Sequence, residues 1–339
     1  MDAISRFRAG HVAAVSHRSH SVSDIVGGRY DLLIVVSSWE ERVGCISLAT
    51  DLQVQRAVLV LYDEVDPDGY RKKNDALLET FMRQIAKEYV PLQHKATALL
   101  ETSLGIFEQM MEASTHLGRP IDVLLDASTC QRYHILAVLA NGFRSGILRR
   151  ISVFYAEGDY PAGEVGLEVV FGEGVWKSIP VPGMEGEYRP DKSLLYCVSV
   201  GFEGHKTLRV VARADPDRVV LVFPKPGITA EYEQRTRIAN KALIEQYAIP
   251  ESSIISAHAG DAVGAWAAMA EASVENWPEE NCVYLLNGTK PHSLAMGLRA
   301  VTTHSPAVLY SVPEAYRVVN IPARGVFWRY DVENLAIPG

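Results

Sequence analysis

Short, continuous apolar runs alternate along the chain with longer stretches whose apolar residues recur at helical spacing. Such runs are typical of parallel strands covered by helices on both faces. In the first half, the predicted strands span 32–36, 57–62, 123–125 and 151–155. The predicted helices span 70–89, 96–116 and 132–143, then 230–247, 262–274 and 293–301 in the second half. Strand followed by helix, several times over, predicts a Rossmann-like open sheet.

The pattern of the first half returns in the second half. The segment that begins at Leu32 matches the segment that begins at Leu194, 162 residues later, and a later match pairs Asp126 with Asn287 at an offset of 161. Each half then closes with a strand and two tyrosines: Tyr155 and Tyr160 in the first, Tyr310 and Tyr316 in the second. Matches in the same order at nearly constant offset predict an internal duplication.

We therefore expect an α/β protein with two tandem Rossmann-like units, whose sheets are mostly parallel and are joined by a Gly- and Pro-rich connector or a small β insertion. The expected boundaries are 1–27 for an N-terminal extension, 28–160 for the first unit, 161–192 for the connector and 193–339 for the second unit. Residues 165–171 and 175–179 alternate in polarity and could form a hairpin. The pattern fits one sheet shared by both halves as well as two separate sheets.

The amino-acid composition excludes some classes of protein. With 48% hydrophobic and 22% charged residues, the chain can bury a hydrophobic core. Its 33 basic and 41 acidic residues give a net charge of −8, so binding of a nucleic acid would need a local basic patch. No run of about 18 apolar residues and no apolar signal core occurs, so we expect a cytoplasmic protein with no membrane partner. The four cysteines include no CxxC pair and are expected to be reduced core thiols, with no metal and no cofactor.

Polar residues concentrate where the predicted strands end, which is where ligands bind in open parallel sheets. After the first strand come Ser37, Ser38, Trp39, Glu40, Glu41 and Arg42. In the matching loop of the second unit, the acid Glu203 corresponds to Glu40 or Glu41. After the strand at 123–125 come Asp126, Ser128, Thr129 and Arg132, matched in the second unit by Asn287, Gly288, Thr289 and Lys290.

The turn from Asn287 to Lys290 suits a phosphate. Glycine permits close backbone approach, Thr289 offers a hydroxyl, and Lys290 brings positive charge to a helix start. The alternative is that Asn287, Gly288 and Thr289 only cap the helix, as Ser128 and Thr129 would do in the first unit.

The first unit carries more side chains that could take part in binding or catalysis. Trp39 could stack on a base, and Glu40, Glu41 and Asp126 could act as catalytic carboxylates that orient water or stabilise a sugar cation. A solvated acidic loop and a packed surface tryptophan are the alternatives. A basic strip of Arg71, Lys72 and Lys73, with Lys225, Arg235 and Arg237 in the matching place, would let an acidic protein hold a polyanion.

The segment 285–295, a strand followed by Gly-Thr-Lys and a helix, resembles the corresponding motif of CARF-type domains, the Rossmann-like nucleotide sensors of prokaryotic CRISPR-linked defence. The doubled unit is similar to the tandem arrangement of SAVED domains. The resemblance implies that Thr289 and Lys290 contact a ligand phosphate and that the loop 201–205 lies on the other side of the pocket. The first unit departs from the motif, with Asp126-Ala127-Ser128-Thr129 in its place.

Two functions remain open at this stage. The first is recognition of a nucleotide or nucleic acid in prokaryotic antiviral defence, with a homodimer as a further expectation. The second is a hydrolase, either a glycosidase that cleaves an N- or O-glycosidic bond of a nucleotide or of modified DNA, or a phosphodiesterase similar to ring nucleases. Fold alone does not choose between them.

Overall fold

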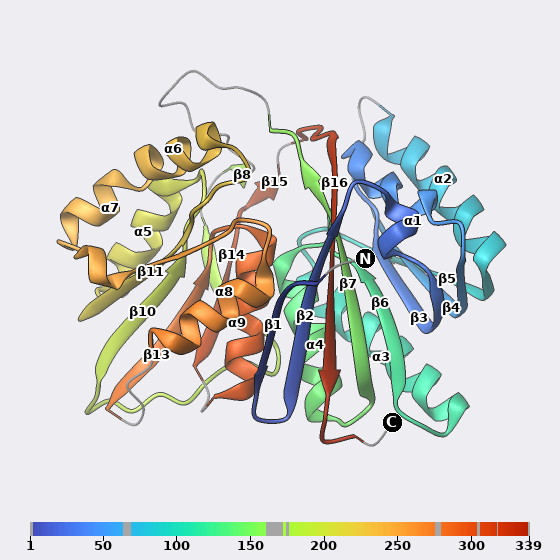
Figure 1. Ribbon diagram of the computed structural model, residues 1–339, viewed down its shortest axis with the longest axis horizontal. Coiled ribbons are helices and arrows are strands. Elements are labelled where there is room, and N and C mark those ends of the chain that lie inside the picture. Colours follow the sequence, from blue (N-terminus) through green and yellow to red (C-terminus); the bar gives the residue numbers. More distant parts are fainter. Residues whose placement is uncertain are drawn as a thin grey trace. The chain divides into compact units, whose positions relative to one another are not determined.

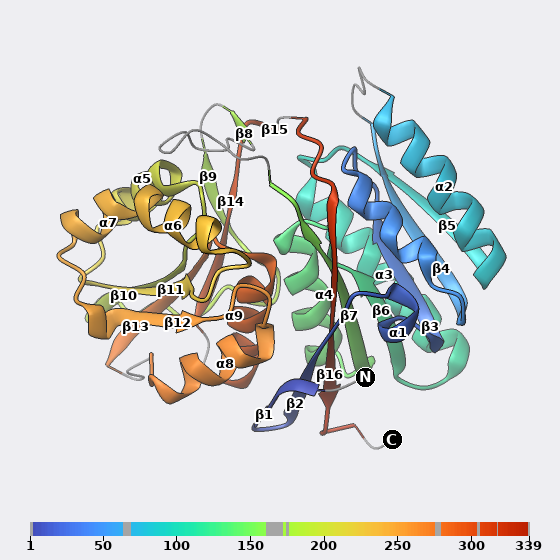
Figure 2. The same ribbon diagram turned by 45° about the horizontal axis from the view of Figure 1, so that its top comes forward.

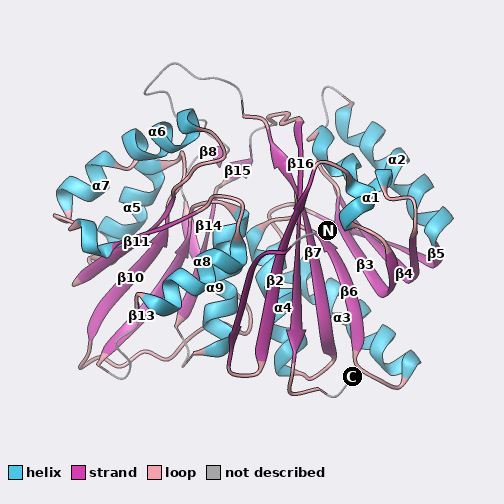
Figure 3. Cartoon of the chain, in the orientation of Figure 1, coloured by secondary structure: helices cyan, strands magenta, loops and turns pink. Residues whose placement is uncertain are grey.

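The computed structural model describes residues 3–63, 69–160, 172–173, 176–274, 279–303, 306–316 and 318–337. The chain forms two compact units (Figure 1): unit 1 comprises Met1–Pro161 and Val318–Gly339, and unit 2 comprises Ala162–Arg317. Each unit has helices on a sheet of its own (Figure 3), with eight strands in the first sheet and six in the second among the described residues. The predicted α/β class with mostly parallel sheets is confirmed, and the two halves do not share one sheet.

The sheet of unit 1 combines a parallel part and an antiparallel part. Five parallel strands lie in the order β5-β4-β3-β6-β7, and β16, β2 and β1 extend the sheet beyond β7 in antiparallel fashion. Their bounds are β1 (Ala3–Ala9), β2 (Val12–Ser19), β3 (Gly28–Val36), β4 (Leu52–Tyr62), β5 (Ala86–His94), β6 (Ile121–Asp126), β7 (Leu148–Gly158) and β16 (Ala323–Asn334).

Helices cover both faces of the parallel part (Figure 2). On one face lie α1 (Val22–Ile25), the 3-10 helix η1 (Glu41–Leu48) and α2 (Tyr70–Ile85); on the other lie α3 (Leu99–Leu117) and α4 (Arg132–Arg144). Leu33 and Leu59 pack in one buried cluster with Leu78 of α2. Because successive strand residues point to opposite faces, a strand covered on both sides must be apolar throughout, which explains the continuous runs in the sequence.

Unit 2 repeats this plan. Its parallel strands lie in the order β12-β11-β10-β13-β14, which is the order of β5-β4-β3-β6-β7, and the antiparallel β9 flanks β14 as β16 flanks β7. The bounds of its strands are β8 (Gly172–Glu173), β9 (Lys177–Pro180), β10 (Ser193–Ser199), β11 (Arg218–Pro224), β12 (Ile254–Ala257), β13 (Glu280–Leu286), β14 (Ala307–Val312) and β15 (Ala315–Tyr316). Its helices are α5 (Gly204–Ala214), α6 (Ala230–Ala239), α7 (Lys241–Gln246), η2 (Glu251–Ser253), α8 (Ala262–Glu271) and α9 (Lys290–Thr302). The shared strand order agrees with the internal duplication read from the sequence.

The boundaries of the units differ from those expected. Residues 1–27 are no separate extension, because β1, β2 and α1 belong to unit 1. The second unit does not continue to residue 339 either, since the chain returns to unit 1 and adds β16 next to β7. β16 pairs with β2 and β7, which are far away in the sequence, so its own apolar pattern does not reveal which sheet it joins.

Two local expectations also need correction. The helix expected at 70–89 ends at Ile85, and Ala86–His94 forms the edge strand β5, whose half-exposed residues lack a strong apolar run. The hairpin expected in the connector falls in part on 161–171 and 174–175, which lie outside the described residues. The described strands there pair elsewhere: β8 pairs with β15, and β9 pairs with β14.

Candidate functional site

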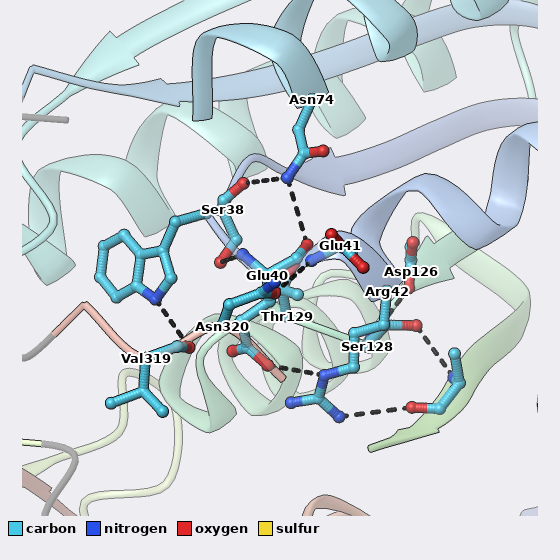
Figure 4. Close-up of polar contacts among 12 residues, drawn as sticks. Ser38, Glu40, Glu41, Arg42, Asn74, Asp126, Ser128, Thr129, Val319 and Asn320 are labelled. Carbon is cyan, nitrogen blue, oxygen red and sulfur yellow. Dashed lines mark hydrogen bonds and ion pairs between the residues drawn. The ribbon is translucent and has the colours of Figure 1, made fainter. Parts of the chain in front are cut away.

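The loop after β3 is held by hydrogen bonds from α2 (Figure 4). Asn74 donates from Nδ2 to the carbonyl oxygens of Ser38, at 2.8 Å, and Glu40, at 3.2 Å. Ser37 donates its N–H to the carbonyl of Val60 at 2.9 Å and its hydroxyl to the Asp75 carboxylate. The predicted ligand-binding residues Ser37 and Ser38 are both buried, so their polar groups serve the loop itself.

Trp39 is held at its edge and at one face. Its Nε1 donates to the carbonyl of Val319 at 3.1 Å, and the guanidinium carbon of Arg71 lies 5.1 Å from the ring centre. Arg71 is 3% exposed and donates to the carbonyl of Tyr62 at 3.2 Å. Arg71 therefore does not belong to the surface strip expected from the sequence; it immobilises Trp39 instead.

Of the two glutamates in the loop, Glu40 forms the ion pair. Arg42 is 3% exposed, donates to Glu40 Oε2 at 2.7 Å and reaches the carbonyl of Ala156 at 3.3 Å. Burial alone would lower the pKa of Arg42, but the charge of Glu40 raises it above its ordinary value. Glu41 is exposed and donates its backbone N–H to Asn320 Oδ1 at 3.0 Å. Glu40 is thus already neutralised by a buried cation of its own loop.

The loop after β6 lies against the loop after β3. Thr129 donates its hydroxyl to the carbonyl of Val36 at 2.9 Å, which ties the two loops together. Asp126 is 1% exposed and accepts the N–H of Ser128 at 2.8 Å, while the Ser128 hydroxyl accepts the N–H of Ala156 at 2.9 Å. These bonds give Asp126 and Ser128 structural partners, but Ser128 and Thr129 do not cap α4, whose N-cap is Gln131 without a side-chain bond, so the capping alternative is wrong for the first unit.

Two further groups of unit 1 lie near these loops. Burial raises the pKa of the Cys45 thiol to about 12, and the charge of Asp126 acts in the same direction, so the thiol stays protonated at neutral pH. Burial also raises the pKa of Tyr155, an effect that Tyr160 reinforces and a hydrogen bond from Arg42 opposes. Arg132 is the half-buried first residue of α4, where it adds positive charge to a helix start.

Unit 2 builds the same loop after β10. The N–H of Val200 donates to the carbonyl of Val222 at 3.2 Å, and Asn240 Nδ2 donates to the carbonyl of Gly201 at 2.7 Å. The guanidinium carbon of Arg235 lies 4.6 Å from the centre of the Phe202 ring. Glu203 pairs with Lys206 at 3.0 Å.

The two loops correspond residue by residue at an offset of 163. The equivalent pairs are Ser37 and Val200, Ser38 and Gly201, Trp39 and Phe202, and Glu40 and Glu203. Each loop has an asparagine on a carbonyl, an arginine on an aromatic ring and a glutamate on a cation. The sequence alone left open whether Glu40 or Glu41 matches Glu203, and the ion pairs select Glu40.

The turn before α9 is packed tightly against β10. Thr289 is the N-cap of α9 and accepts the N–H of His292 at 3.2 Å, so the capping alternative is correct for this hydroxyl. Gly288 donates to Ser199 Oγ at 3.0 Å, and a Cβ at this position would lie 2.8 Å from the carbonyl oxygen of Val200. Pro291 has no N–H, and the N–H groups of Asn287, Gly288 and His292 are all bonded within the protein.

Asn287 links this turn to the loop after β10. Its Nδ2 donates to Thr207 Oγ1 at 3.2 Å, and that hydroxyl donates to the carbonyl of Glu203 at 3.0 Å. The second bond uses the hydroxyl proton, which fixes the orientation of the Asn287 amide. Asn287 Oδ1 is buried and has no hydrogen-bond partner among the described residues. Asn287 and Asp126, both at the ends of equivalent strands, are buried rather than open to a ligand.

Sequence reasoning missed Asn74 on α2, Arg235 on α6 and Asn240 between α6 and α7, in the segments that follow the second strand of each unit. A buried polar residue within a helical pattern is the only signal that could have indicated them. The closing tyrosines do come together in unit 2, where the Tyr310 and Tyr316 hydroxyl oxygens are 3.3 Å apart.

Other expectations concern metals, thiols and membranes. None of the four cysteines forms a disulfide. Over the described ranges, no three His, Cys, Asp or Glu side chains are grouped as metal ligands. No helix among the described residues has both the length and the apolar character needed to cross a bilayer.

No family model and no curated protein matches the chain. Among solved structures it is similar to a chain described as a universal stress protein and to a protein of unknown function, both from Pseudomonas aeruginosa. In each case the identity is 12%, the match covers 83% of this chain and 92% of the other, and the TM-score is 0.24. A likeness this distant carries no argument about function, and the fold class follows from the strand order above.

Proposed function

We propose that this chain recognises a nucleotide or a nucleic acid at the carboxyl-terminal edges of its two parallel sheets. The observation that carries the proposal is the loop after β3, with its aromatic ring, stacked arginine and ion-paired glutamate, which recurs after β10. In open α/β sheets, ligands bind at this edge.

The charges in these loops argue against a purely structural role. Arg42, which pairs with Glu40, and Arg71 of α2, which contacts the loop, are each 3% exposed. Buried ion pairs contribute little to stability, because desolvation offsets their attraction, and apolar residues of similar size would stabilise a loop as well. Charged loops of the same design in both units therefore favour a ligand-binding role.

Positive charge at two helix starts supplies the contact for phosphate. Lys290 begins α9 in unit 2, and Arg132 begins α4 in unit 1. The N-terminus of a helix favours anions through its N–H groups and its dipole, and a cationic side chain adds a charge-assisted bond.

The test compares Lys290→Ala with Lys241→Ala, a matched control whose lysine is 72% exposed on α7. Thermal shift and calorimetric titration with mononucleotides and with linear and cyclic oligonucleotides measure binding. A hydrogen bond to a charged group contributes about 1.5–3 kcal/mol, so Lys290→Ala should weaken binding by roughly tenfold to 150-fold. The control should bind as the wild type does. If no nucleotide or oligonucleotide binds, or if both variants bind alike, the proposal is wrong.

The hydrolase alternative stays a prediction. Two of its three carboxylates, Glu40 and Asp126, are engaged by Arg42 and by the N–H of Ser128. Recognition is therefore the function that the geometry favours. A role in antiviral defence rests on the resemblance of 285–295 to CARF-type domains, and it too stays a prediction, as does a homodimer.

A further inference from the structure

Both aromatic rings at the sheet edges are held in a fixed orientation. Trp39 is bound through its Nε1 to the Val319 carbonyl, and Phe202 meets Tyr232 edge to face with 5.5 Å between the ring centres. A ring that is already immobilised loses little conformational entropy when a flat ligand stacks on it.

An arginine supports each ring from one face. The guanidinium carbons of Arg71 and Arg235 lie 5.1 and 4.6 Å from the ring centres, and the Arg235 side chain is only 10% exposed. Because these guanidinium groups are buried, they are not surface groups that could leave the ring easily. Trp39 and Phe202 themselves remain partly exposed to solvent.

The phosphate-binding groups lie on the neighbouring loop in each unit. In unit 2, a Cβ on Gly201 would be 3.1 Å from the carbonyl oxygen of Asn287, so the Phe202 loop lies against the turn that leads to Lys290. In unit 1, the bond from Thr129 to Val36 joins the Trp39 loop to the turn that leads to Arg132. An aromatic ring beside a cation is the arrangement that holds a base together with its phosphate.

We infer that Trp39 and Phe202 are two equivalent stacking platforms for nucleobases, one in each unit, so that one chain binds two bases. This inference rests on the proposed function and adds the ligand group and the stoichiometry to it. If the rings had a purely structural role instead, removing either ring would leave the number of nucleotides bound per chain unchanged.

Calorimetric titration with a mononucleotide tests the stoichiometry. The wild type should bind two molecules per chain, and Trp39→Ala and Phe202→Ala should each lose one of them. Base stacking contributes about 1–3 kcal/mol per base, so binding at the altered site should weaken by roughly fivefold to 150-fold. Trp39→Phe and Phe202→Trp keep a stacking ring, and both should retain two sites. Tyr188→Ala serves as a control at an aromatic residue that is 70% exposed.

The outcomes separate the two proposals. If the wild type binds nucleotides but both alanine variants keep two sites of unchanged affinity, the stacking inference fails and the proposed function stands. A wild type with a single site also overturns the inference. If the wild type binds no nucleotide, the proposed function fails, and the inference falls with it. Should an alanine variant unfold, Trp39→Phe and Phe202→Trp still decide the question through the change in tryptophan fluorescence on nucleotide binding. If the bases stack on these rings, the change due to Trp39 vanishes in Trp39→Phe, and a new change appears in Phe202→Trp.

Discussion

Replacing Gly288 by alanine tests why a glycine stands at the turn before α9. From the sequence, this glycine suits the close approach of a ligand phosphate, whereas the structure shows a close approach of the strand β10. A Cβ at Gly288 would lie 2.8 Å from the carbonyl oxygen of Val200 and 2.9 Å from the Cβ of Ser199. Neither atom can rotate away, because one belongs to the backbone and the other is bonded directly to it.

The size of the effect follows from these contacts. Overpacking a tight site costs about 1–3 kcal/mol. The reduced freedom of the unfolded chain when glycine becomes alanine stabilises the fold by about 0.4–1 kcal/mol, because the φ of Gly288 is not in the left-handed region. We expect a net loss of about 1–2 kcal/mol, which lowers the melting temperature by roughly 2–8 °C for a unit of this size.

Differential scanning calorimetry measures this loss, and Gly27→Ala provides the matched control. A Cβ at Gly27 would meet its nearest atom, the carbonyl oxygen of Asp51, at an ordinary 3.9 Å. The control should change stability by less than about 0.5 kcal/mol. If Gly288→Ala keeps the stability of the wild type but loses nucleotide binding, the glycine serves the ligand, and the reasoning from β10 is wrong.

Two further predictions concern stability. Gly204→Ala should prevent unit 2 from folding, because its Cβ would lie 1.7 Å from the carbonyl oxygen of Ala239; a normal far-ultraviolet circular dichroism spectrum with an unchanged melting temperature would contradict this. Burial lowers the pKa of His134 to about 3 and that of His292 to about 4, whereas an unfolded histidine titrates near 6.5. Between these values the unfolded chain binds protons that the folded chain does not, so stability should fall as the pH drops from about 6.5 towards 4. Urea unfolding at several pH values measures this slope, and His134→Gln should make it shallower; an equal slope in the variant would refute the assignment.

The fold class, the duplication and the position of the polar loops at the carboxyl edges of the parallel strands follow from the sequence alone. Strands covered on both faces need continuous apolar runs, so the sequence predicted β3, β4, β6 and β7. The polar residues that follow these parallel strands must lie at the carboxyl edge of the sheet. In the structure, the bond from Thr129 to Val36 brings the loops that carry Ser37 to Arg42 and Asp126 to Arg132 together.

The tertiary structure shows what each polar side chain does. Thr289 caps a helix, Glu40 neutralises Arg42 and Arg71 supports Trp39, because partners distant in the sequence come close only when helices pack on the sheet. It also decided that β16 joins unit 1, and that Glu40 rather than Glu41 is the counterpart of Glu203. Hydrophobic periodicity is set by burial along one element, whereas hydrogen bonds and ion pairs depend on distances between elements, which the order of residues along the chain does not contain.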